Sequence, residues 1–222
     1  MSNSTSWLIA NYVRTRFPAW LVLPLALIVT VPAVASGAVA FAGEFAVVWG
    51  MALLLVLEFR LWDDLYDREQ DCRENPSRVL CQAESLKPFV VLYGMLRIGN
   101  LALVAWRWVV PAIVTLVVLQ LLLGRWYAIR SRWRLGPVVN YHLVLLKYPA
   151  CGYVLAAGFG ETAGTSLFAS LAVVYLGLCI GEVLHDRRLR GLNSAWICLG
   201  IEATLLVSIL AWWSAQVAYI GG

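Results

Sequence analysis

The feature that most constrains the fold is a series of apolar stretches, each about as long as a helix that crosses a bilayer. Such a helix needs about 20 apolar residues. The 222-residue chain is 61% hydrophobic and 14% charged, with a mean hydropathy of +0.76, whereas a soluble domain carries about 25% charged residues. The sequence therefore predicts an all-α membrane protein. About seven transmembrane helices are expected in one bundle, at approximately residues 18–42, 44–62, 87–105, 108–124, 138–158, 165–184 and 194–220.

The distribution of Lys and Arg predicts the direction of these spans. The first apolar run is too long for the short core of a cleavable signal peptide, so it is expected to remain as a helix. Most of the basic residues lie before the first span or in the loops that follow the second, fourth and sixth spans. Loops that are rich in Lys and Arg face the cytoplasm. We therefore expect a multi-pass protein, of the plasma membrane, with its N-terminus inside and its C-terminus outside. Residues 1–222 form one domain in this interpretation, with a cytoplasmic N-terminal segment (1–17) and two cytoplasmic motif loops (63–86 and 185–193).

An acidic cluster at the cytoplasmic end of the second span is the clearest functional signal. The stretch "EFRLWDDLYDREQDCRENPSRVL" holds most of it. At about 100° per residue, three of its aspartates share one helical face, and their mutual repulsion calls for a compensating cation. A second polar segment, "GEVLHDRRLRG", ends the sixth span. Because these two spans run in the same direction, a parallel internal repeat would let both segments face one mouth. The carboxylates of the first segment are Asp63, Asp64, Asp67, Glu69, Asp71 and Glu74.

Magnesium suits such a site, because it takes hard oxygen ligands and is commonly shared between one or two carboxylates and the phosphates of a substrate. Arginines could bind the remaining phosphate oxygens. The pattern therefore favours a polyphosphorylated ligand over a solvated loop that only sets the topology. The arginines concerned are Arg68, Arg73, Arg78, Arg187, Arg188 and Arg190.

The stretch "DDLYDREQDCRENPSR" resembles the first aspartate-rich motif of the UbiA-type intramembrane prenyltransferases, NDxxDxxxD followed by a Pro-x-Arg step. Asp63 stands in place of the Asn, and Pro76 and Arg78 match the later step. The second segment preserves Asp186, Arg187 and Gly191 but has Glu182 where aspartate is usual. "YHLVLLKYP" is similar to the family's Tyr and Lys positions, with Tyr141 and Lys147. The family usually has about nine helices, so the resemblance covers roughly residues 15–195.

The resemblance implies an enzyme that moves a prenyl group from a prenyl diphosphate to an aromatic or lipophilic acceptor, with Mg2+ as cofactor. Such an enzyme contacts membrane lipids and binds no nucleic acid. The resemblance allows either a monomer or an oligomer. Metal ligands would be Asp63, Asp64, Asp67, Asp71, Glu182 and Asp186, of which Asp64, Asp67, Asp71 and Asp186 would be catalytic. The diphosphate would be bound by Arg68, Arg78, Lys147 and Arg187. Candidate aromatic walls, which could equally serve only in packing, are Trp62, Tyr66, Tyr127, Tyr148 and Tyr153.

Two alternatives share this site: a membrane terpene cyclase, and a non-catalytic lipid-binding or transport protein of the same fold. The CDP-alcohol phosphotransferases need a motif that this chain lacks, and hydropathy excludes the soluble prenyl synthases. His185 could act as a base or as a structural partner, and His142 is a weaker candidate. Glu58, Arg97 and Glu202 are expected to pair with each other inside the bundle. The five cysteines are expected to pack as small apolar residues or to lie in a reducing loop.

Overall fold

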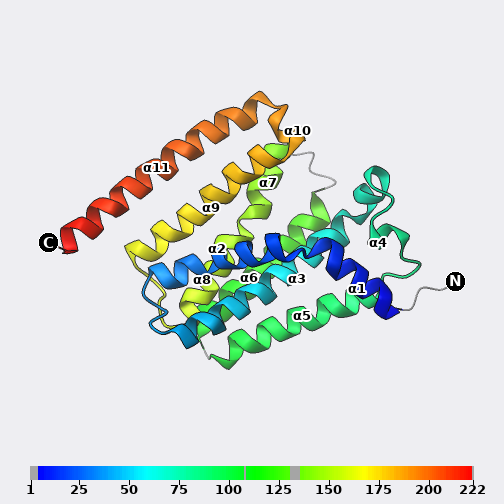
Figure 1. Ribbon diagram of the computed structural model, residues 1–222, viewed down its shortest axis with the longest axis horizontal. Coiled ribbons are helices and arrows are strands. Elements are labelled where there is room, and N and C mark those ends of the chain that lie inside the picture. The colour runs from blue at the N-terminus through cyan, green and yellow to red at the C-terminus, as the bar shows by residue number, and fades with distance from the viewer. Residues whose placement is uncertain (1–4, 108, 131–135, 222) are drawn as a thin grey trace.

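The computed structural model describes residues 5–107, 109–130 and 136–221, and within these ranges it contains helices and no strand. Figure 1 shows the helices side by side, with the N-terminus and the C-terminus at opposite ends of the long axis. The elements are α1 (Thr5–Arg16), α2 (Ala19–Ala35), α3 (Ala42–Glu74), α4 (Val79–Gln82), α5 (Lys87–Trp106), α6 (Val110–Ile129), α7 (Pro137–Leu145), α8 (Lys147–Gly158), α9 (Thr165–His185), α10 (Arg187–Arg190) and α11 (Asn193–Gly221).

Five helices within the described ranges are long and apolar enough to cross a bilayer: α3, α5, α6, α9 and α11. A sixth span results if α1 and α2 are one broken segment, since they bend by 67° at their junction. Pro18 explains the break, because a proline disfavours helical geometry in the residue before it. The expected fifth span, 138–158, instead corresponds to two short helices, α7 and α8, which meet at Leu146 and are not among the helices long enough to cross a bilayer. The molecule is thus an α-helical, multi-pass membrane protein.

Two segments differ from the expected boundaries. α3 does not end with the membrane span but continues through the acidic cluster to Glu74, so the expected loop at 63–86 is helical over its first half. The N-terminal segment likewise forms α1, whose Tyr12 is fully buried. Tyr12 packs in a cluster with Leu61, Leu80 and Phe89. Apolar contacts between residues distant in sequence thus hold α1 against the bundle.

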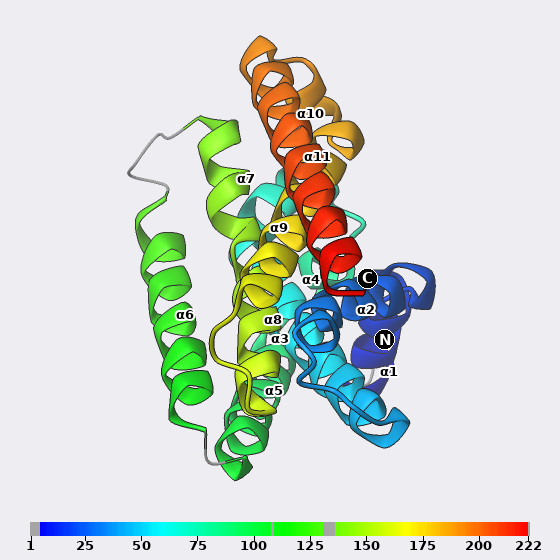
Figure 2. The same cartoon turned by 90° about the vertical axis from the view of Figure 1, so that its left-hand side faces the viewer.

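The centre of the bundle is α8, which packs against α2, α6 and α9. Figure 2 shows α8 between these helices, with α6 at one edge of the molecule. The contact with α2 is close because Gly152 has no side chain. A Cβ at this position would lie 2.8 Å from Pro32 Cγ and 3.2 Å from the Val29 carbonyl oxygen.

Gly152→Ala is therefore expected to lower the free energy of unfolding by about 1–3 kcal/mol, the usual cost of overpacking a core. Gly94→Ala is the matched control. Gly94 lies in α5, and a Cβ added there would have no atom within 4 Å. The better helix propensity of alanine should therefore leave the free energy of unfolding unchanged or raise it by up to about 1 kcal/mol. Unfolding in detergent would measure both. Equal effects of the two substitutions would contradict this account of the α2–α8 contact.

α11 lies along α9 and extends beyond the rest of the bundle (Figure 1). Many of its large apolar side chains, including Ile197, Ile201 and Val207, are exposed, as expected for a helix that faces lipid. Glu202 differs from these exposed apolar side chains, because it has an ionisable carboxyl group and is only 5% exposed. α11 is thus joined to the bundle by a narrow face that contains one buried carboxyl group.

Candidate functional site

Two cavities lie at the end of α3 that carries the acidic cluster. The larger has a volume of about 610 Å³, and the smaller about 250 Å³. Residues of α3, α7 and the end of α9 contribute to both, so the expected meeting of the two polar segments is confirmed. The residues shared by the two linings are Asp67, Tyr127, Arg130, Asn140, Tyr141 and Glu182.

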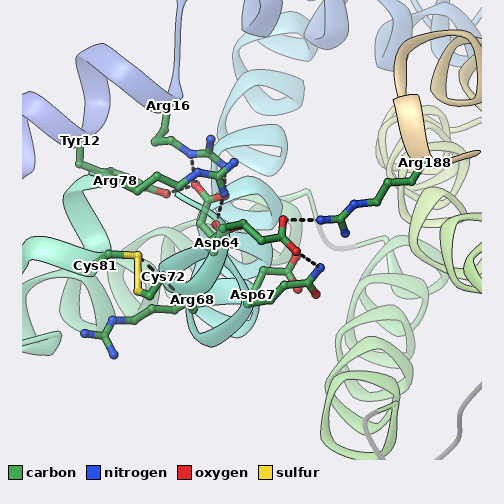
Figure 3. A network of polar contacts seen from close by, with 12 residues as sticks. Tyr12, Arg16, Asp64, Asp67, Arg68, Cys72, Arg78, Cys81 and Arg188 are labelled. Carbon is green, nitrogen blue, oxygen red and sulfur yellow. Dashed lines mark hydrogen bonds and ion pairs between the residues drawn. A yellow bond between two sulfur atoms is a disulfide. The ribbon is translucent and has the colours of Figure 1, made fainter. Parts of the chain in front are cut away.

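A direct ion pair between Glu74 at the end of α3 and Arg188 in α10 also joins the two polar segments. Figure 3 shows Arg188 reaching from its separate element toward the α3 cluster. The Glu74 carboxylate accepts a hydrogen bond from Arg188 and so raises the pKa of that guanidinium. Both side chains are largely exposed, so the pair contributes little to stability.

Each aspartate of the predicted motif is paired with a cation from another part of the chain. Asp67 pairs with Arg130, which follows α6, and Asp71 pairs with Arg78, which precedes α4. The compensating charge that we expected from magnesium is thus supplied here by the protein's own cations. The other two pairs are Asp64 with Arg16 and Asp63 with Lys147.

Asp64 is the most enclosed of the four aspartates, with 4% of its surface exposed. Tyr12 donates to its Oδ2 at 2.8 Å. Arg16 Nε donates to the same oxygen at 2.8 Å, and a second Arg16 nitrogen binds Oδ1. This two-point contact is the geometry in which arginine binds carboxylates most strongly. Asp64 therefore holds α1 against α3 (Figure 3), a role that the predicted motif did not indicate.

Lys147 is the first residue of α8, directly after the break at Leu146, and it is 1% exposed. Its Nζ binds Asp63 Oδ2, while the other oxygen of Asp63 accepts from the Tyr127 hydroxyl. The Lys147 ammonium also lies 5.2 Å from the ring centroid of Tyr148. The structure thus places the intramembrane lysine in the cavity expected from the sequence, but with an aspartate as its partner.

Aromatic rings cover one side of this region. Tyr66 and Tyr127 are stacked with centroids 4.8 Å apart, and Arg130 lies 4.9 Å from the Tyr127 centroid. Trp62 is buried beneath them, 5.6 Å from Tyr127. Tyr153 lies elsewhere, in an apolar groove between α6 and α8. Four of the five candidate aromatic walls are thus near the acidic cluster.

The carboxylates of this site fit magnesium only if the ion is shared between the protein and a phosphate ligand. Among the described residues, no three of the motif carboxylates offer oxygens within 4.8 Å of one another, so they do not form an all-protein cage. However, the ion pairs of Asp67 and Asp71 each use one oxygen, and the Glu182 carboxylate makes no hydrogen bond or ion pair with another described residue. Hard oxygen donors of this kind suit Mg2+ that completes its shell with water and phosphate.

Several predicted residues lie away from the smaller cavity. Arg68 donates to the Leu80 carbonyl at 2.9 Å and points away from Asp64 and Asp67 in Figure 3. Asp186 lines only the larger cavity and accepts a hydrogen bond from the Arg188 backbone at 2.7 Å. Neither Arg187 nor His185 contributes to the two linings. Of the four residues predicted to bind diphosphate, Arg78 and Lys147 thus line the smaller cavity, and Arg68 and Arg187 do not.

Three arginines of the smaller cavity were not predicted: Arg16, Arg60 and Arg130. Arg60 is the most informative, because its Nε is buried and has no hydrogen-bond partner in the described part of the chain. It precedes Asp64 by one helical turn, and side chains four residues apart share a helix face. The four-residue spacing from Asp64 could therefore have identified Arg60 as a residue of the site. Nothing in the sequence pairs Arg16 with Asp64, 48 residues away.

The pairing expected among the intramembrane charges is wrong in part. Glu58 accepts hydrogen bonds from Asn100 at 2.7 Å and Gln120 at 3.0 Å, and Arg97 donates to Gln120 at 3.1 Å. Glu58 and Arg97 are thus joined through an amide. Glu202 instead contacts His142. Helix rotation decides such partners, and uniformly apolar helices do not reveal their rotation in sequence.

The interpretation of the cysteines is also wrong for two of them. Cys72 and Cys81 form a disulfide between the end of α3 and α4, with Cα atoms 5.3 Å apart. The bond closes the loop that carries Arg78 (Figure 3). Their spacing matches no standard motif, so only the fold of this loop reveals the pair. Cys151, Cys179 and Cys198 are free.

Comparison of the chain with protein-family models, with curated proteins and with solved structures found no match. The functional assignment therefore depends on the residues and on their arrangement.

Proposed function

We propose that this protein is a Mg2+-dependent intramembrane prenyltransferase. It would have a UbiA-like fold of seven spans with a parallel repeat, and would act in the plasma membrane at the end of the bundle that holds both polar segments. The supporting observation is that acidic and basic side chains of both polar segments line two cavities, which share lining residues, at one end of an apolar bundle. A ligand with an anionic head and an apolar chain matches this combination of surfaces.

The ion pairs suggest how such a head would bind. A diphosphate entering the smaller cavity would take hydrogen bonds from Arg60, Arg130 and Lys147. Arg130 would then be drawn from Asp67, whose carboxylate would become free for a cation. Bound magnesium would neutralise the charge that grows on the departing diphosphate. Asp67 and Glu182 are the two carboxylates common to both cavities, so we assign them as its main protein ligands, with Asp63, Asp71 and Asp186 nearby.

The aromatic side chains would serve the other product of this bond cleavage. Loss of diphosphate leaves an allylic cation on the prenyl chain, and ring faces attract cations. Tyr66 and Tyr127 line the larger cavity and Tyr148 the smaller one. Transfer is complete when an aromatic or lipophilic acceptor gives electrons to that carbon and loses a proton. If the chain captures its own cation, the product is a cyclic terpene.

One observation favours a different role. Because each motif aspartate already has a protein cation, the cluster is electrically satisfied without a metal. A protein that binds or transports a lipid diphosphate, and leaves it intact, would need no more than the exchange of these pairs.

The test is diphosphate release by the detergent-purified full chain. A panel of prenyl diphosphates of different length would be supplied with a mixture of aromatic and lipid acceptors, with magnesium or with a chelator. We expect magnesium-dependent release with the wild type and a loss of at least about 100-fold in Asp67→Asn. Glu84→Gln is the matched control, because Glu84 is exposed on the same side and lines neither cavity.

The outcomes separate the candidates. Release with a prenylated acceptor supports transfer, whereas release with only cyclic or hydrolysed prenyl products identifies cyclisation or hydrolysis. Saturable binding of the prenyl diphosphates without release supports the lipid-binding role. Absence of both release and binding would overturn the proposal.

A further inference from the structure

A separate cluster of His142, Cys179 and Glu202 lies where α7, α9 and α11 meet. His142 Nε2 is 3.2 Å from Glu202 Oε1, and Cys179 Sγ is 3.5 Å from His142 Nδ1. One potential ligand atom from each residue lies within 4.8 Å of the other two. None of the three lines the cavities of the proposed active site. They therefore form a second site, which the proposed function does not use.

The cluster is enclosed and incompletely satisfied. Cys179 has no exposed surface and Glu202 is 5% exposed. Glu202 Oε1 accepts a hydrogen bond from Tyr141 at 3.3 Å, but Oε2 is buried and has no hydrogen-bond partner among the residues that the structure describes. Burial of an unpaired carboxyl oxygen costs free energy, so such groups usually have a ligand. The side chain of His142 keeps 26% of its surface exposed, which leaves a route for a small ion.

We propose that His142, Cys179 and Glu202 bind a transition-metal ion of the Zn2+ class. Imidazole, thiolate and carboxylate are the protein ligands of zinc, and three such ligands leave a fourth position for water. Bonds of about 2.0–2.3 Å in a tetrahedral shell place ligand atoms about 3.5 Å apart. One ligand atom from each of the three residues already lies within 4.8 Å of the other two, so small side-chain movements would complete such a shell. A thiol ligand favours zinc over magnesium, which prefers oxygen.

Charge also favours this ion at this depth in the bundle. A divalent cation with one thiolate, one carboxylate and one neutral imidazole has no net charge, so the occupied site avoids the cost of a buried charge. Binding releases the Cys179 proton to solvent, because the thiolate is the ligand. Without metal, the same site buries a carboxyl group with one unsatisfied oxygen.

The surrounding residues resemble the outer shell of a metal site. The Tyr175 hydroxyl lies 2.9 Å from His142 Nδ1, and the Tyr141 ring stacks on the imidazole with centroids 4.3 Å apart. Such contacts fix the orientation of a ligating histidine. The metal would also join α11 to α7 and α9, and α11 has few other buried side chains.

The test uses metal-free full-length protein in detergent, titrated with Co2+ and then with Zn2+, in the absence of magnesium and prenyl diphosphate. We expect one Co2+ per chain with a thiolate-to-cobalt charge-transfer band, displaced by Zn2+. Cys179→Ser should abolish the band, and His142→Ala and Glu202→Gln should each weaken binding by more than about tenfold. Cys151→Ser should behave as wild type, because Cys151 is a buried free thiol in α8.

Wild-type protein that shows no charge-transfer band, or a band that persists in Cys179→Ser, would overturn the proposal whether or not the other variants fold. Size-exclusion profiles and helical content would verify that each variant is folded. The readout is independent of prenyl transfer, so failure here and failure of the proposed function are distinguishable.

Discussion

Lys147→Met is expected to lower the free energy of unfolding by about 3–5 kcal/mol. Lys147 is almost fully buried and binds Asp63, whose side chain is 17% exposed. Removal of the lysine leaves the Asp63 carboxylate with the Tyr127 hydroxyl as its only remaining partner among the described residues. A buried ion pair that loses one member is strongly destabilising, because the remaining charge is uncompensated. Unfolding in detergent, followed by far-UV circular dichroism, would measure the loss.

The double variant Asp63→Asn with Lys147→Met is the decisive control. It removes both charges and leaves a neutral amide beside Tyr127, so most of the lost stability should return. Asp63→Asn alone should be destabilising for the opposite reason, since it leaves the lysine buried without its partner. If the double variant were as unstable as the sum of the two single variants, the pair would not be coupled as the structure describes.

Arg60→Gln should weaken binding of inorganic pyrophosphate by about 10–150-fold. Arg60 lines the smaller cavity, and its Nε has no partner within the described chain. Hydrogen bonds to charged groups contribute about 1.5–3 kcal/mol, which corresponds to this range of affinity. Glutamine keeps a polar side chain in the cavity but removes the positive charge. Isothermal titration of the detergent-purified protein with pyrophosphate and magnesium would measure the change.

Arg68→Gln provides the comparison, because Arg68 is in the same helix but donates to the Leu80 carbonyl outside the cavities. Its affinity should stay within about twofold of wild type. A larger loss in Arg68→Gln than in Arg60→Gln would show that the diphosphate binds beyond α3, on the side of α4, and would refute the assignment of the smaller cavity. Arg68 is thus the position at which sequence motif and structure make opposite predictions, whereas Arg60 is indicated by the structure alone.

The acidic cluster illustrates what can and cannot be read from a motif. The spacing of Asp64, Asp67 and Asp71 indicates a shared helical face, and the like charges on it require a cation. Sequence reasoning chose magnesium for that cation because magnesium takes hard oxygen ligands and is commonly shared between carboxylates and the phosphates of a substrate. The structure pairs Asp67 with Arg130, which is 63 residues away, and Asp63 with Lys147, which is 84 residues away. Local spacing carries no information about such partners.

The sequence by itself determined the all-α membrane class, the long apolar helices and the position of the two polar segments at the ends of their helices. The physical reason is that these properties follow from apolar length and polarity along the chain, and both are local. Only the tertiary structure decided the ion-pair partners, the Cys72–Cys81 disulfide and the His142–Cys179–Glu202 cluster. Those depend on how each helix is rotated and where it bends, and apolar side chains on every face of a membrane helix leave rotation undetermined until the helices pack.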